Sequence, residues 1–170
     1  MSVVSCSSLV FRRPVADDHA RVMATAAGWW GGREPSATVP AVFFEHFRSS
    51  SLLVEHEDLL VAFLVGFDCP DHADEAWVHY CAVHPAWRRA GLGRDVYRRF
   101  CAGARARGRS VVRAVAAADD TLAIAFHLGL GFTAVSGDGD AALPVAYRAP
   151  HPRREDAVRL ELRLSAMEAA

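Results

Sequence analysis

A short stretch near the middle of the chain combines arginines and glycines in a pattern suited to holding a phosphate group. It runs from Val83 to Arg94 and contains Gly91 and Gly93. A strand-like apolar run, Ala76 to Val83, precedes it, and a helical pattern, Leu92 to Arg107, follows it. A glycine turn at a helix N-terminus presents backbone N–H groups to an anion and leaves room for its approach. The pattern predicts a pyrophosphate-binding turn, although such turns are also used simply as tight connections.

Two common phosphate-binding motifs do not fit this turn. A P-loop requires Gly-Lys-Ser/Thr, but Arg94-Asp95 follows Gly93. A dinucleotide fingerprint requires a third glycine three residues later, where Val96 stands. What remains is Arg88-x-x-Gly91-x-Gly93, which resembles the acyl-CoA signature Gln/Arg-x-x-Gly-x-Gly/Ala of the GCN5-related N-acetyltransferase (GNAT) family.

A second stretch, downstream of the first, strengthens the resemblance. Residues Ala123 to Phe132 are similar to the family's later helix-to-strand motif, which ends in Gly-Phe. The stretch departs from the family pattern at Asp120, where Asn is common, and at His127, where Tyr is common. The resemblance implies an acetyl-CoA-dependent N-acyltransferase, with acetyl-CoA as the acyl donor.

The composition fits one globular domain of this class. The chain has 170 residues, of which 52% are hydrophobic and 23% charged, so it can bury a sizeable core. We expect a single domain over 1–170 with a core over about 9–164. The 19 basic and 20 acidic residues nearly cancel, so a broad nucleic-acid surface is not indicated. The oligomeric state is open, with a homodimer as one alternative.

The N-terminus and the cysteines indicate a cytoplasmic protein. The first residues lack the basic start and long apolar run of a signal peptide, and no stretch is long enough to span a membrane. The four cysteines show no paired spacing, so we expect reduced thiols. Cys69 and His72 have a metal-like spacing but no second pair nearby, so we expect no metal.

The order of predicted elements also agrees with the family. The patterns predict strand, two helices, three strands, helix, strand, helix and two strands, with a hairpin turn at Glu57-Asp58. The first helix begins at Asp17 or Asp18, and the last at Asp119 or Asp120. The resemblance implies an α/β (α+β) GNAT-like acyl-CoA N-acyltransferase fold. Its mixed, mostly antiparallel sheet has about seven strands, flanked by about four helices and opened beside Ala76–Val83.

The resemblance implies where the donor binds. The main chain of the strand end meets the pantetheine arm, and backbone N–H groups of the turn meet the pyrophosphate. The later motif adds contacts near the sulfur. The donor-binding residues so implied are Cys81, Ala82, Val83, Arg88, Arg89, Ala90, Gly91, Leu92, Gly93, Arg94, Asp120, Phe126 and His127.

Three residues are candidates for moving protons. The attacking amine must be neutral, and the departing thiolate can take a proton. His79 lies on the strand, on the side of Cys81, and is the candidate base; Tyr80 is another, and pairing of His79 across the sheet is the alternative. His127 stands where the resemblance implies an acid near the sulfur. A histidine hydrogen-bonded in the core is the alternative there.

The acceptor side is predicted from aromatic residues and charge. The resemblance implies that the segment between the first two helices lines the acceptor site. Its aromatic residues and glycines suit a small organic amine, with Trp29, Trp30, Gly31 and Phe44 as the lining. Glu75 ends an acidic loop, Asp68 to Glu75, that would attract the amine's cation unless it is only a solvated turn. Plain core packing is the alternative for the tryptophans.

Two other functions remain open from the sequence. One is acyl transfer with a macromolecular acceptor or donor, such as a protein amine or a charged tRNA. Its support is a cluster of arginines: Arg98, Arg99, Arg105, Arg107, Arg109 and Arg113. The other is a catalytically degenerate protein that binds CoA without turnover, which the departures at Asp120 and His127 allow.

Overall fold

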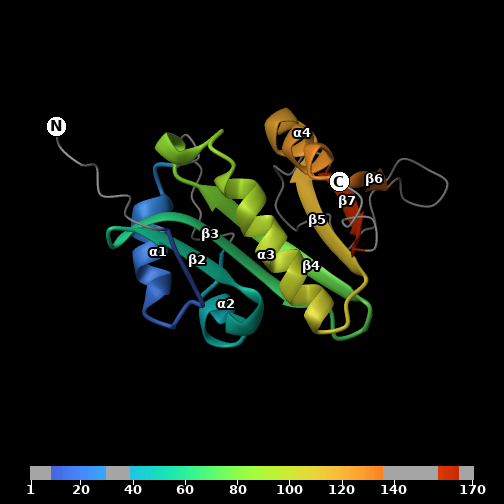
Figure 1. Ribbon diagram of the computed structural model, residues 1–170, viewed down its shortest axis with the longest axis horizontal. Coiled ribbons are helices and arrows are strands. Elements are labelled where there is room, and N and C mark those ends of the chain that lie inside the picture. The colour runs from blue at the N-terminus through green and yellow to red at the C-terminus, as the bar shows by residue number, and fades with distance from the viewer. Residues whose placement is uncertain (1–8, 30–38, 136–156, 165–170) are drawn as a thin grey trace, which may run out of the picture. The chain divides into compact units, whose positions relative to one another are not determined.

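The computed structural model describes residues 9–29, 39–135 and 157–164 (Figure 1). The elements follow the predicted order, with short 3-10 turns added. In chain order they are β1 (Val10–Arg12), α1 (Asp18–Ala26), α2 (Val42–Glu45), η2 (Arg48–Ser50), β2 (Leu52–His56), β3 (Leu59–Asp68), β4 (Glu75–Val83), η3 (Pro85–Trp87), α3 (Leu92–Ala106), β5 (Val111–Ala117), α4 (Thr121–Gly129), β6 (Thr133–Val135) and β7 (Ala157–Arg163).

The strands form a seven-stranded mixed sheet in the order β1-β2-β3-β4-β5-β7-β6. β1 with β2, β2 with β3, β5 with β7 and β6 with β7 pair antiparallel. β4 pairs with β5 in parallel, because the helix α3 connects them. The mixed, mostly antiparallel sheet and the four α-helices among the described residues confirm the predicted fold class.

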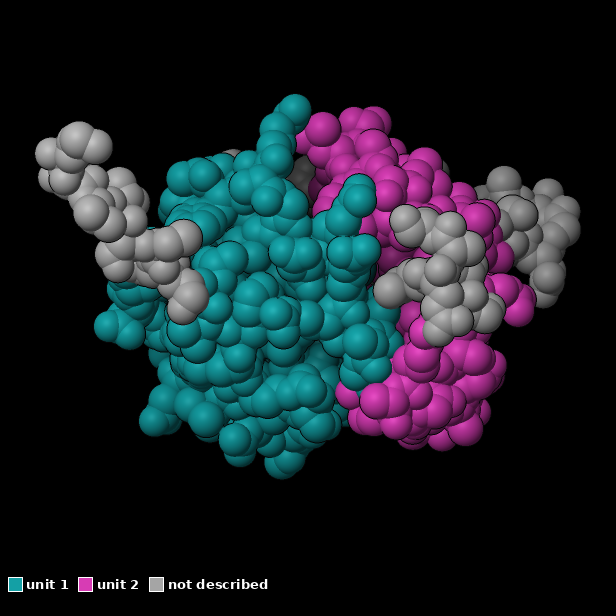
Figure 2. Space-filling model, viewed as in Figure 1, with its two compact units in different colours: residues 1–67, 80–103 teal, residues 68–79, 104–170 magenta. Residues whose placement is uncertain are grey.

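The chain groups into two compact units, coloured separately in Figure 2. The first comprises residues 1–67 and 80–103, and the second comprises residues 68–79 and 104–170. The Arg88–Arg94 turn belongs to the first unit, while the acidic loop, β5 and α4 belong to the second.

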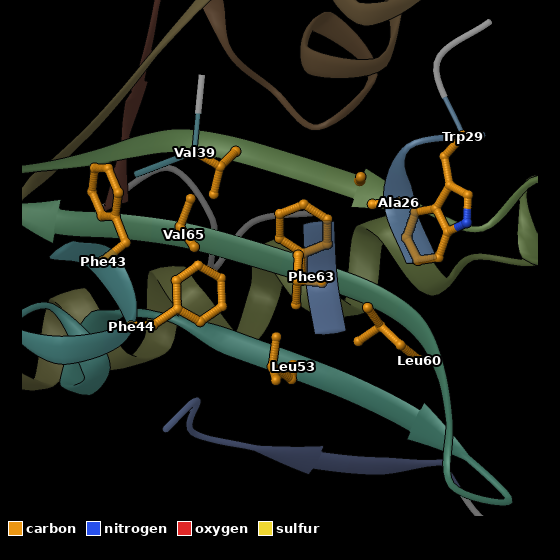
Figure 3. Packing of buried hydrophobic residues seen from close by; sticks show 11 residues of the cluster. Ala26, Trp29, Val39, Phe43, Phe44, Leu53, Leu60, Phe63 and Val65 are labelled. Atoms are coloured by element: carbon orange, nitrogen blue, oxygen red, sulfur yellow. The ribbon is translucent and has the colours of Figure 1, made fainter. Parts of the chain in front are cut away.

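The core of the first unit is rich in aromatic side chains. Phe43 and Phe44 from α2, Phe63 from β3 and Trp29 after α1 pack with aliphatic residues in one cluster (Figure 3). Trp29 lies beside Phe63, with ring centroids 6.2 Å apart. Burial of these large side chains supplies the main driving force for this unit. The cluster anchors the C-terminal end of α1 at Trp29.

The start of α1 is held by an ion network rather than by a side-chain cap. Asp17 occupies the N-cap position, but its side chain makes no cap bond. Arg12 instead binds Asp18 at 2.7 Å and Glu55 at 2.8 Å, and Arg21 also binds Glu55. Hydrogen bonds from Arg12 hold the pKa of both carboxyl groups below their usual values.

The predicted hairpin between β2 and β3 is confirmed. Both turn residues, Glu57 and Asp58, have positive φ, at 49° and 62°. A two-residue turn with both residues in the left-handed region has a backbone twist that matches the right-handed twist of the two flanking strands. Arg21 donates to the Asp58 carbonyl and thereby braces this turn.

The helix α3 has the predicted buried stripe. Leu92, Val96, Phe100 and Ala104 are each at most 3% exposed. The helix ends where Gly108 takes φ +82°, as predicted. The Arg109 N–H donates to the Ala104 carbonyl and the Gly108 N–H to the Arg105 carbonyl, which is the Schellman arrangement.

Within the part of the chain that the structure describes, no helix is both long and apolar enough to cross a membrane. Cys69, Cys81 and Cys101 are not in disulfide bonds. Cys6 lies outside the described residues.

Candidate functional site

The turn between β4 and α3 has the backbone conformation of a binding loop. Gly91 has φ +87° and Arg89 has φ 62°. A Cβ placed on Gly91 would meet no atom of the described chain within 4 Å. The glycine is therefore required by its backbone conformation, and the space above it is open for a ligand.

The first turn of α3 has backbone amides available to a ligand. The first backbone bond of the helix runs from the Asp95 N–H to the Gly91 carbonyl, at 3.1 Å. The amides of Leu92, Gly93 and Arg94 precede this bond, so they belong to the N-terminal groups that lack an intrahelical acceptor. Such amides, together with the positive end of the helix dipole, favour a bound anion.

Two arginines, Arg89 and Arg94, belong to the same turn. The side chains of Arg89 and Arg94 are exposed, and neither makes a hydrogen bond or ion pair to another described residue. Ala90 and Gly91 are exposed as well, whereas the Leu92 side chain is buried in the α3 stripe. Leu92 can therefore serve a ligand only through its main chain.

The turn rests on rigid parts of the first unit. The His84 N–H donates to the Val61 carbonyl of β3 at 2.9 Å, and the Trp29 ring packs edge-on against His84. On the other side, Trp87 in η3 packs against His56 of the β2–β3 hairpin, with ring centroids 4.8 Å apart. The hairpin and the end of α1 thus both support the turn.

The strand before the turn extends beyond its pairing with β5. The parallel pairing joins Glu75–Trp77 of β4 to Val111–Arg113 of β5, and β4 continues to Val83. Cys81 and Val83, whose main chain is predicted to meet the pantetheine arm, follow the last residue that pairs with β5. Ala82 packs its side chain into the core of the first unit.

A family model matches most of the chain, including this turn. Residues 19–132 match the family model described as the Acetyltransferase (GNAT) family. The chain belongs to this family. This is the family that the two motifs predicted.

Individual relatives agree with this assignment. The chain is 29% identical over 93 residues to L-2,4-diaminobutyric acid acetyltransferase of Vibrio cholerae serotype O1, a match that covers 55% of this chain and 54% of the relative. It thus spans about half the length of the relative that it matches.

Solved structures show the same fold. Diaminobutyrate acetyltransferase EctA from Paenibacillus lautus, in complex with L-2,4-diaminobutyric acid and coenzyme A, has a TM-score of 0.71 at 20% identity, covering 92% of this chain and 95% of that one. YncA, a putative acetyltransferase from Salmonella typhimurium with acetyl-CoA, has a TM-score of 0.66 at 20% identity, covering 93% and 95%.

The first residue of the GNAT signature departs from its predicted role. The Arg88 N–H is not available to a phosphate, because it donates to the Pro85 carbonyl at 3.3 Å and closes η3. Its guanidinium binds two backbone carbonyls, those of Val83 and Trp29. The prediction of a phosphate contact through the Arg88 amide is therefore wrong for this conformation. The backbone amides available to a phosphate are those of residues that follow Arg88 in the turn.

The three candidates for moving protons have different surroundings. His79 is exposed on β4, as a base that meets an incoming amine needs to be. Tyr80 is half-buried and stacks on Phe63, with ring centroids 6.1 Å apart. Beside the same strand, burial raises the pKa of the Cys81 thiol to about 12 and that of the Tyr97 phenol well above its usual value. Both groups therefore keep their protons at neutral pH.

His127 is a buried, neutral histidine. Its Nδ1 lies 2.7 Å from the Ala123 carbonyl, and its ring packs edge-on against Phe132. Burial lowers its pKa below the usual histidine value. A neutral imidazole whose Nδ1–H donates to Ala123 has an unprotonated Nε2, so it has no spare proton for a thiolate. The geometry favours the structural alternative for His127 over the acid predicted from the resemblance.

The other residues of the later motif lie on α4. The Asp120 carboxylate accepts the Ala123 N–H at 3.0 Å and caps the helix, as predicted. Phe126 is 38% exposed and Leu122 is 76% exposed, so α4 presents apolar side chains at its surface. Whether Asp120 and Phe126 contact the donor remains a prediction.

The predicted acceptor residues lie in different environments. Trp29 and Phe44 are 5% and 0% exposed and belong to the core of the first unit, which corrects their prediction as the lining of a pocket. Glu75 binds Arg113 at 2.7 Å, so its charge is already compensated. Trp30 and Gly31 lie outside the described residues.

The acidic loop and the arginine cluster largely neutralise each other. Arg107 binds Asp68 through two hydrogen bonds, at 2.7 and 3.0 Å, and Arg109 lies 3.6 Å from the same carboxylate. Arg113 also binds Glu161 at 2.9 Å. Arg105 binds the Leu164 carbonyl. These arginines therefore do not form a free basic surface, and Asp68 and Glu75 are not free to attract a cation.

Arg99, another member of the cluster, lies over the Phe11 ring at 3.9 Å from its centroid. The cluster is therefore explained mainly by packing and ion pairing inside each unit. Among residues 9–29, 39–135 and 157–164, no group of three or more metal-ligating side chains is close enough to hold a metal ion.

Sequence reasoning missed the contacts that support the turn. Nothing in the spacing of Arg88, His84 and His56 shows that the first bridges two carbonyls or that the others pack on tryptophans. The aromatic pairs join residues far apart in the chain, so only the fold could have revealed them.

Proposed function

We propose that the protein transfers an acetyl group from acetyl-CoA to a primary amine of a small molecule by direct attack. The observation that carries this proposal is the turn before α3. It combines available amides at Leu92, Gly93 and Arg94 with open space at Gly91, in a chain of the GNAT family. Its relatives include proteins named as diaminobutyrate acetyltransferases, which supports a small amine as acceptor.

The turn supplies what the pyrophosphate of acetyl-CoA needs. Three amides at a helix start donate hydrogen bonds, and hydrogen bonds to a charged acceptor are about twice as strong as neutral ones. The guanidinium groups of Arg89 and Arg94 add positive charge at the surface of the same turn. The missing side chain at Gly91 lets the phosphate approach the backbone closely.

The reaction then requires one proton to leave the amine. The neutral nitrogen attacks the thioester carbonyl, the carbonyl oxygen becomes negative, and the C–S bond breaks to release the CoA thiolate. The nitrogen, positively charged after the attack, loses a second proton to give the amide, and the thiolate takes up one proton. His79 is the base that we propose, because it is exposed on β4, the strand that leads into the turn. A water chain or Tyr80 is the alternative. The lowered pKa of His127 makes it a poor source of the proton that the thiolate takes up.

A histidine variant tests this proton path. We expect His79→Ala to lower kcat/KM by about 10²–10⁴-fold, the range for loss of a general base. The rate should also lose its dependence on pH near neutrality. His72→Ala is the matched control, because His72 is likewise exposed but lies in the acidic loop. Full activity of His79→Ala from about pH 6 to about pH 9 would assign the proton to water or Tyr80.

His127→Phe separates an acid from a structural residue. A structural role predicts a nearly unchanged kcat and a lower melting temperature, because the bond to Ala123 is lost. A large fall in kcat with unchanged CoA affinity and unchanged stability would show that His127 donates the proton after all.

The function itself is tested by release of the CoA thiol. The purified protein is incubated with acetyl-CoA and single amines, including L-2,4-diaminobutyrate, polyamines, aminoglycosides and amino acids, and each product is identified by mass. We expect at least one small primary amine to gain a single acetyl group. Turnover with peptides or charged tRNA alone would contradict the small-amine proposal, and donor binding without any turnover would indicate a degenerate CoA-binding protein.

A further inference from the structure

The Arg88 side chain joins two segments of the first unit that are far apart in the chain. Its Nε donates to the Val83 carbonyl at 3.0 Å, and its Nη2 donates to the Trp29 carbonyl at 2.5 Å. Val83 is the last residue of β4, and Trp29 follows the last turn of α1. A planar guanidinium can hold two acceptors at once in a fixed geometry, which an ammonium cannot.

Both carbonyl groups belong to well-anchored residues. Trp29 is buried in the aromatic core, and its own N–H donates to the Ala26 carbonyl at 2.9 Å. His84, directly after Val83, packs its ring edge-on against the Trp29 ring, with centroids 5.4 Å apart. The guanidinium bridge and this ring contact therefore hold the same two segments together, one through the main chain and one through side chains.

We propose that Arg88 is a positioning residue for acetyl transfer, which fixes the end of β4 against the end of α1. It acts on the reaction through the backbone of Val83 rather than by touching the phosphates of the donor. The Val83 main chain is predicted to meet the pantetheine arm, so the orientation of this peptide sets where the thioester lies. The phosphates bind to other groups, the amides of Leu92, Gly93 and Arg94, which follow the turn.

This separation of roles makes a kinetic prediction, which rests on the proposed function. Loss of the Arg88 bridge should misplace the thioester, and small misplacements cost up to about 100-fold in rate. We therefore expect Arg88→Ala to lower kcat by about 10–100-fold. The Kd for acetyl-CoA should change by less than about threefold, because the phosphate-binding amides remain.

Two further variants make the kinetic test specific. Arg88→Lys keeps the charge but cannot bridge the two carbonyls, so we expect it to resemble Arg88→Ala in kcat. Arg48→Ala is the matched control, because Arg48 also donates from Nε to a distant carbonyl, that of Pro14 at 2.9 Å. The control should stay within about twofold of the unchanged protein in kcat.

A readout without catalysis separates this inference from the proposed function. Hydrogen exchange of the segments that cover Ala26–Trp29 and Val83–Trp87 is measured in the protein without substrates. We expect faster exchange in both segments for Arg88→Ala and Arg88→Lys, and in neither for Arg48→Ala. This result would stand even if no amine were acetylated.

A role for the Arg88 side chain as a phosphate ligand would give different results from those expected here. If its side chain were a phosphate ligand, Arg88→Ala would weaken acetyl-CoA binding by more than about tenfold, and Arg88→Lys would restore most of the affinity. The affinity of the Arg88→Ala protein would also depend less on salt. Those results, together with unchanged exchange at Ala26–Trp29, would overturn the proposal.

Discussion

The two ends of α3 have similar backbones but opposite uses. Each has a glycine in the left-handed region, Gly91 at φ +87° and Gly108 at φ +82°, and a Cβ on either would meet no described atom within 4 Å. At the C-terminal end, the turn's amides bond to carbonyls of the helix itself, from Gly108 to Arg105 and from Arg109 to Ala104. At the N-terminal end, the amides of Leu92, Gly93 and Arg94 precede the first helical bond. A glycine turn therefore indicates a ligand only when its neighbouring amides are left for one.

The arginines at the two ends differ in the same way. Arg107 and Arg109 at the C-terminal end bind the carboxylate of Asp68, so their charge serves stability. Arg89 and Arg94 at the N-terminal end are exposed and make no ion pair with a described residue. All four residues are arginines, but only Arg89 and Arg94 are available to a phosphate group.

The largest effect is expected from placing the same side chain on each glycine. Gly91→Glu and Gly108→Glu both force an L residue into the left-handed region, at about 1–2 kcal/mol of unfolding free energy. Only Gly91→Glu brings a carboxylate against the pyrophosphate, and like charges at an interface cost several kcal/mol. We expect a loss of acetyl-CoA affinity of at least about 100-fold in calorimetry for Gly91→Glu alone.

The outcome that would break this comparison is simple to recognise. Equal affinity of the Gly91→Glu and Gly108→Glu proteins for acetyl-CoA would mean that the donor does not bind at the start of α3. A thermal melt of both proteins checks that the two folds have survived to the same extent.

Neutralising one arginine at each end of α3 should give smaller effects, and on two different quantities: donor affinity at the N-terminal end and stability at the C-terminal end. Arg94→Gln removes a free charge beside the amides, so acetyl-CoA affinity should fall about 3–10-fold and depend less on salt. Arg107→Gln breaks two hydrogen bonds to Asp68 in a partly exposed pair, so the free energy of unfolding should fall by about 1 kcal/mol. Calorimetry and urea unfolding of both variants measure the two quantities. A stability loss for Arg94→Gln without an affinity loss would show that its charge is structural.

The smallest effect concerns the start of α4, where a side chain of the protein occupies the helix end. Asp120 accepts the Ala123 N–H, so Asp120→Ala should cost about 1 kcal/mol of stability. Asp120→Asn keeps the cap and should leave the free energy of unfolding nearly unchanged. An altered acetyl-CoA affinity in the stable Asn variant would show that Asp120 also contacts the donor, in contrast to a purely capping role.

Local signals explain why the fold and the donor turn were predictable. The stripe of Leu92, Val96 and Phe100 and the glycines at each end of α3 identify this helix and its limits without reference to the rest of the chain. The Glu57-Asp58 hairpin and the Asp120 cap are equally local. The resemblance at Arg88-x-x-Gly91-x-Gly93 and Gly131-Phe132 then selected the family.

The errors arose where a role depends on contacts between distant residues. Phe44 is an aromatic residue of the type that often lines a binding pocket, but its side chain is enclosed by the core. Glu75 was expected to attract a cation, yet Arg113, far along the chain, compensates it. His127 resembles an acid by position, while burial among Phe126 and Phe132 keeps it neutral. Charge balance and burial depend on tertiary packing, which a single sequence does not reveal.

The most direct test of the donor site is amide hydrogen exchange resolved by residue, measured by NMR with and without acetyl-CoA. If the start of α3 binds the pyrophosphate, the amides of Leu92, Gly93 and Arg94 should exchange more slowly when acetyl-CoA is bound. The amides of Gly108 and Arg109, already bonded within the chain, should not change. Saturating acetyl-CoA that leaves the first three amides unprotected would contradict the account.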